Sequence, residues 1–217
     1  DPPTMLAAFR EIAKTGLPVA IHNENQELVE RLTDAARAAG QTQPIMHART
    51  RPPIAETMAD QEIFELGLAT GAHVHIAHSS LARGFSIAEG FRAQGARATG
   101  EACIHYLCMT EADLERLGGR GKCNPPFRTA EEVERMWAAL LHNKIEYVST
   151  DHAPWPLARK TDADIFACGA GLIGLQSFAP LMLTLLDERG LSPALIARLC
   201  AARPARLHGI DDRKGAL

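Results

Sequence analysis

The chain alternates short apolar runs with longer stretches of helical periodicity, and this alternation limits the possible folds more than any other feature. Four apolar runs bounded by turn residues predict buried strands, at 17–21, 73–77, 96–103 and 145–150. Strands that alternate with helices are typical of parallel β/α units. Four of them fit either an open doubly wound sheet or half of a (β/α)₈ barrel, whereas a full barrel needs about 250 residues.

Apolar residues at helical spacing predict the intervening helices, over 4–14, 26–39, 54–69, 87–93, 175–188 and 192–207. Thr110 is expected to open a further short helix. The pair Thr129 and Glu132 has the spacing of a capping box, which predicts the start of a helix there. Residues 41–53 carry no periodic pattern, and we expect them to form a loop.

Composition indicates one ordinary globular domain over residues 1–217, in which 46% of residues are hydrophobic and 23% are charged. A formal net charge of −3 without a basic cluster gives no sign of a nucleic-acid partner. No apolar run reaches the 18 residues of a membrane span, and the opening Asp1-Pro2-Pro3 does not resemble a signal peptide. The five cysteines lack C-x-x-C spacing, which predicts reduced thiols and a cytoplasmic protein.

Three residues with metal-binding side chains stand where predicted strands end. His22 follows the first strand, His78 the second and Asp151 the fourth. The carboxyl ends of parallel strands converge on one mouth, so these side chains are expected to lie close together. A lone histidine after a strand is more often structural, but two imidazoles and a carboxylate together favour a divalent metal, with Zn²⁺ first.

Other candidates are weaker. Ser79 and Ser80 lack a surrounding G-x-S-x-G, so a serine nucleophile is not predicted. No glycine-rich phosphate loop follows any strand, so a nucleotide fold is not indicated either. Five other histidines are expected to be ordinary strand, packing or surface residues: His47, His73, His75, His142 and His208.

Along almost its whole length the chain resembles the cyclic amidohydrolase branch of the amidohydrolase superfamily, which includes hydantoinases, dihydropyrimidinases, allantoinases and dihydroorotases. Four segments resemble the fifth to eighth barrel strands of that family, in order 17–25, 75–80, 100–107 and 149–154. Residues 121–128 resemble its substrate-ring loop, 171–175 the next loop, and 203–207 a late helix. The resemblance rests on the order of these blocks, since each alone is weak.

This resemblance implies the C-terminal half of a (β/α)₈ TIM-type barrel, without the upstream strands and the flanking β-sandwich. It implies hydrolysis of a ring amide by a metal-activated hydroxide at a binuclear Zn²⁺ centre. His22 and His78 would hold one metal, and Asp151 would bind the other and shuttle the proton. The ring would be bound by Asn124, by main-chain groups near Ile173 and by His105.

Two family elements are missing from the sequence. No His-x-His precedes His22, and Lys14 lies within a predicted helix rather than at a strand end, where the family has a carboxylated lysine that bridges the metals. Asn23 and Trp155 are smaller departures near the substrate mouth. We therefore expect the chain to be part of a longer enzyme, and the isolated chain to bind metal weakly and to associate through an exposed apolar face.

Several alternatives stay open at this level. Asn124 before two prolines favours dihydroorotase, whereas residues 47–53 favour hydantoinase or allantoinase, which we prefer slightly. A non-catalytic scaffold or regulatory subunit is a second class, although such proteins typically lose the ligands that this chain keeps. A mononuclear deaminase-type site is a third. A small cyclic amide is the expected partner, and a homodimer or homotetramer the expected assembly.

Overall fold

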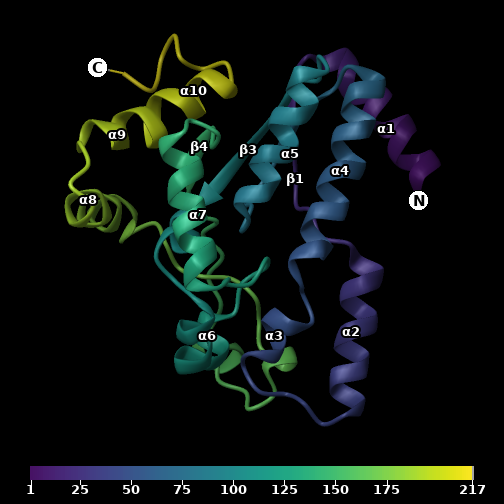
Figure 1. Cartoon of the computed structure of the whole chain (residues 1–217), viewed down its shortest axis with the longest axis vertical. Helices are drawn as coiled ribbons and strands as arrows, with labels where there is room; N and C mark the ends of the chain where they lie inside the picture. Colours follow the sequence, from purple (N-terminus) through teal and green to yellow (C-terminus); the bar gives the residue numbers. More distant parts are fainter. Residues whose placement is uncertain (217) are drawn as a thin grey trace.

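The computed structural model describes residues 1–216 as a four-stranded parallel sheet with helices packed on it (Figure 1). The strands are β1 Pro18–Ile21, β2 His73–Ile76, β3 Ala98–Cys103 and β4 Tyr147–Ser149. The main helices are α1 Pro2–Thr15, α2 Gln26–Ala38, α4 Pro53–Thr70, α5 Ala82–Ala93, α7 Ala130–Leu141 and α8 Phe178–Glu188. Shorter helices are α3 Met46–Arg49, α6 Glu111–Leu117, α9 Ala194–Ala197 and α10 Arg203–Leu207.

The strands follow one another across the sheet in chain order, β1-β2-β3-β4. Register pairs Val19 with Val74 and Ile21 with Ile76, so the apolar residues of neighbouring strands share one face. Helices α1, α4, α5 and α7 lie side by side over this face, each in contact with the next. The predicted parallel β/α architecture is therefore confirmed.

The opposite face of the sheet is polar. His73 and His75 both reach the Thr99 hydroxyl, at 3.0 and 2.9 Å, which confirms that they share a face. Glu101 and Tyr147 continue this face, and the ring of His75 stacks on Tyr147 with centroids 5.1 Å apart. Parallel sheets are normally covered on both faces.

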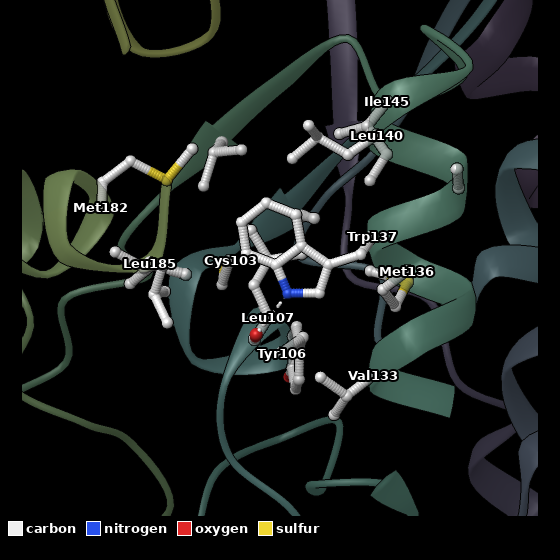
Figure 2. Close-up of a cluster of buried hydrophobic side chains, with 14 of the residues drawn as sticks. Cys103, Tyr106, Leu107, Val133, Met136, Trp137, Leu140, Ile145, Met182 and Leu185 are labelled. Atoms are coloured by element: carbon white, nitrogen blue, oxygen red, sulfur yellow. Dashed lines mark hydrogen bonds between the residues drawn. The ribbon is translucent and has the colours of Figure 1, made fainter. Parts of the chain in front are cut away.

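A buried cluster joins β3 to α7 and α8 (Figure 2). Trp137 lies at its centre, 1% exposed, and its indole N–H donates to the carbonyl of Leu107 at 2.7 Å. Met136 and Leu140 on the same helix are both fully buried. Because truncating such a tryptophan to alanine typically costs about 3–5 kcal/mol, this cluster is a principal anchor of the last strand.

The predicted capping box at Thr129 is only half formed. The Thr129 hydroxyl accepts from the N–H of Glu132 at 3.3 Å, as expected at the start of α7. The Glu132 carboxylate does not return to Thr129 but accepts from the N–H of Ala82 at 2.8 Å. This contact across 50 residues satisfies the start of α5, which begins five residues before the predicted position at Ile87.

Other boundaries differ modestly from the prediction. The segment predicted as a loop contains the single-turn helix α3, and the predicted helix over 192–207 starts at Ala194 and includes a π-helical turn at Arg198–Ala202. The five cysteines are all free thiols, as predicted. Within residues 1–216, no helix is both long and apolar enough to cross a membrane.

Candidate metal centre

His22, His78 and Asp151 each follow a strand directly or within two residues, at the carboxyl edge of the sheet. Three non-glycine residues among 1–216 have positive φ angles, and two of them are His78 (φ 37°) and Asp151 (φ 43°). This backbone region is disfavoured for residues with a Cβ atom, and such outliers concentrate where function fixes a side chain. The backbone therefore marks two of the three predicted ligands.

The two histidines lie against each other. Nδ1 of His22 is 3.1 Å from Nε2 of His78, and the ring centroids are 4.8 Å apart. These residues are 56 positions apart in the sequence and meet because β1 and β2 pair in register. Their predicted convergence is thus a feature of the structure.

Negative charge surrounds His78. Its backbone N–H donates to the Glu101 carboxylate at 3.3 Å, which holds the left-handed peptide at the strand end. Burial lowers the pKa of His78, and the neighbouring His22 lowers it further. Asp151 and Glu101 act in the opposite direction and raise this pKa. The ring is therefore neutral near pH 7, the form in which imidazole binds metals.

The donor set fits one half of a divalent metal site. A tetrahedral ion with Zn–N bonds of about 2.0–2.1 Å separates two nitrogen ligands by roughly 3.3 Å, close to the observed 3.1 Å. Nδ1 of His78 is buried with no hydrogen-bond partner in the described chain. No group of three or more His, Cys, Asp or Glu side chains is assembled for a metal anywhere in residues 1–216, so Asp151 is near His78 without completing a ligand set.

Of the three predicted substrate-binding residues, His105 and Ile173 line one cavity, and Asn124 is not among its lining residues. Asn124 precedes a cis peptide bond to Pro125, and its side-chain oxygen is buried without a partner. Burial lowers the pKa of His105 to about 3, so its ring is neutral. Ile173 is 77% exposed and lines, with His105 and Trp155, a cavity of about 490 Å³.

Two lysines fix the loop around this cavity. The Lys160 ammonium donates to the carbonyls of Lys122, Gly169 and Gly171 at 2.8–2.9 Å. The Lys122 ammonium donates in the same way to three carbonyls of residues 165–168. Burial lowers the pKa of both lysines, to about 8 for Lys122. Sequence reasoning did not single out either residue, since isolated lysines in a polar segment carry no local signal.

The other histidines behave largely as expected. His47 is 2% exposed, and its Nε2 donates to the carbonyl of Cys123 at 2.8 Å. His142 is exposed directly after α7, and its Nδ1 bonds to the carbonyl of Ala138 in that helix at 2.7 Å. Lys14 lies within α1, exposed and paired with Glu11. It is therefore not placed to bridge metals.

Fold and site together define an α/β protein whose strand ends carry a candidate metal centre, the class in which barrel hydrolases belong. The chain belongs to the amidohydrolase family, whose family model matches residues 1–217, and within it to the cyclic amidohydrolase branch, hydrolases of cyclic C–N bonds.

Two curated relatives and one solved structure illustrate the similarity. An allantoinase from Solibacter usitatus is 40% identical over 98% of this chain and 47% of its own length. A D-hydantoinase from Rhizobium radiobacter is 32% identical over 100% of this chain and 49% of its own. The structure of an L-hydantoinase (dihydropyrimidinase) from Arthrobacter aurescens superposes with a TM-score of 0.96 at 29% identity, covering 100% of this chain and 49% of that one.

The chain thus spans about half the length of the relatives it matches. The predicted family is confirmed. The four-stranded parallel sheet is consistent with part of a TIM barrel, while the numbering of its strands as the fifth to eighth stays a prediction.

Proposed function

We propose that the protein containing this chain hydrolyses a ring amide bond in a cyclic ureide, with allantoin-type hydantoins as the first substrate class. The observation that carries the proposal is the 3.1 Å approach of His22 Nδ1 to His78 Nε2 at the edge of the sheet where Asp151 follows β4. Membership of the cyclic amidohydrolase branch supplies the reaction class.

His22 and His78 would hold a divalent ion, with Asp151 at the same edge for a second position. Such an ion, when bound, lowers the pKa of water towards 7 and polarises the ring carbonyl. The Asp151 carboxylate takes the proton of the attacking water and delivers it to the ring nitrogen. A C–O bond forms as the C–N bond breaks, and the product is an acyclic carboxylate with the proton on its nitrogen.

Recognition of the ring falls to groups that have free hydrogen-bonding capacity. The buried side-chain oxygen of Asn124 has no partner and can accept a ring N–H, because unpaired buried acceptors are costly unless a ligand satisfies them. Nε2 of His105 is likewise buried and unpartnered. Exposed Ile173 lines the cavity, where its main-chain groups would bind the ring.

The test is a ring-opening assay with allantoin, hydantoin, dihydrouracil and dihydroorotate, run with metal analysis. Asp151→Asn should lower kcat by roughly 10²–10⁴-fold, the usual contribution of a general acid–base group. His142→Gln is the matched control, since His142 is exposed and bonds to the helix that precedes it. If the protein binds stoichiometric metal but opens none of the four rings, hydrolysis of a cyclic amide is rejected. If it binds no metal and opens no ring, the result favours a non-catalytic scaffold.

A further inference from the structure

The carboxylate of Glu24 lies beside His22 and has no role in the proposed chemistry. Glu24 follows His22 by two residues, in the connection from β1 to α2, and its Oε2 is 3.2 Å from Nε2 of His22. The Glu24 side chain is 1% exposed, whereas that of His22 is 49% exposed. The imidazole is therefore held from its buried end, while the rest of the ring stays accessible at the strand edge.

Glu24 is itself fixed by a buried ionic network. Arg51 pairs with the same Oε2 atom, and the Arg51 side chain is 15% exposed. The backbone carbonyl of Arg51 accepts from Arg128, which pairs in turn with buried Glu56. The pairing with Arg51 and the burial of the side chain hold the Glu24 carboxylate in one position.

This arrangement determines which nitrogen of His22 carries the proton. A neutral imidazole has one N–H and one lone pair. The Glu24 carboxylate oxygen, 3.2 Å from Nε2, favours a proton on that nitrogen, which leaves the lone pair on Nδ1. Nδ1 is the atom that faces His78 at 3.1 Å.

We propose that Glu24 is a positioning residue, which fixes the tautomer and direction of His22 so that its Nδ1 lone pair points into the gap shared with His78. The inference rests on the proposed function, in which that gap holds a divalent ion. Carboxylates that accept from the remote N–H of a ligating histidine raise its basicity and orient its ring.

The test measures the His22 tautomer and the affinity for Zn²⁺ separately. In metal-free protein, long-range ¹H–¹⁵N correlation spectra should show His22 protonated at Nε2, and Glu24→Ala should shift it towards a mixture of tautomers. Competition with a chromophoric chelator should show the Zn²⁺ Kd raised roughly 10–100-fold in Glu24→Ala. Glu24→Gln, which keeps an acceptor oxygen, should show a smaller shift in the His22 tautomer and a smaller rise in the Zn²⁺ Kd.

Glu62→Gln is the matched control, because Glu62 is exposed on α4 and its loss of charge should change neither readout. Glu24→Ala leaves Arg51 without its partner, so Glu24→Gln provides the decision if the alanine variant unfolds. Unchanged tautomer in a folded Glu24 variant would overturn the proposal, even if the Zn²⁺ Kd rose. If wild-type protein bound no Zn²⁺, the proposed metal function would fail, and the tautomer measurement would still decide the role of Glu24.

Discussion

Acidification should destabilise the protein through His47, a buried histidine that is not among the predicted metal ligands. His47 is 2% exposed and held neutral, and burial is the main reason that its pKa falls from 6.5 to about 3. In the unfolded chain the same ring titrates near 6.5. Between these two values the unfolded state binds a proton that the folded state does not, so the free energy of unfolding falls as the pH falls.

The size of the effect follows from this difference in proton binding. Each pH unit within the window changes the free energy of unfolding by about 1.4 kcal/mol per residue. From pH 7 to pH 5 the contribution of His47 is therefore about 2 kcal/mol. It depends little on the folded pKa as long as that value stays below about 4.

His47→Gln isolates this contribution. Glutamine can still donate to the Cys123 carbonyl that His47 contacts at 2.8 Å, but it does not titrate. Urea unfolding followed by tryptophan fluorescence at pH 7, 6 and 5 should show wild type losing about 2 kcal/mol more than the variant. Buried His105, with a pKa near 3, adds to the absolute pH dependence in both proteins and cancels in the comparison.

His142→Gln, at an exposed site directly after α7, should keep the pH dependence of wild type. Equal pH dependence in wild type and His47→Gln would refute the reasoning, since it would mean that His47 takes up its proton in the folded state as readily as in the unfolded one.

Two further changes test buried charges. Burial and the nearby Glu56 carboxylate raise the pKa of Asp60 from 3.8 to about 7. Between these two values the folded state binds a proton that the unfolded state has lost, so the free energy of unfolding falls as the pH rises from 4 to 7. In urea unfolding at pH 8, the free energy of unfolding of Asp60→Asn should be higher than that of wild type by on the order of 3 kcal/mol. This difference should disappear at pH 4, and the opposite pH trend would contradict the prediction. Lys160→Met removes the ammonium donor from three buried carbonyls, of which that of Lys122 keeps the N–H of Gly171, and should lower the free energy of unfolding by about 3 kcal/mol. Exposed Lys14→Met should change it by less than about 0.5 kcal/mol, and similar losses in both variants would count against the buried-donor argument.

Local patterns predicted most elements because their causes are local. The periodicity of α4 and the glycine that follows it are sufficient to place its end, where Gly71 adopts the left-handed cap (φ 77°). The start of α5 was missed by five residues, since the N–H of Ala82, its first residue, is satisfied by Glu132 from a helix distant in the sequence. The same contact explains why a correct capping signal at Thr129 gave only half of the expected motif.

The candidate site divides in the same way. The positions of His22, His78 and Asp151 after apolar runs could be predicted, because strands end where apolar alternation stops. The role of Glu24 could not, although it stands only two residues from His22. A glutamate after a strand is ordinary unless its side chain is known to turn inward and meet Arg51.

By itself, the sequence determined the parallel β/α order, the inward faces of the helices and the residues at the strand ends, because hydrophobic periodicity and turn chemistry act over a few neighbouring residues. Tertiary structure alone decided which atoms meet: Nδ1 of His22 against Nε2 of His78, and the Glu24 carboxylate against both His22 and Arg51. Those contacts depend on strand register and on the burial of charge between segments far apart in the chain. Neither is encoded in any short stretch of residues.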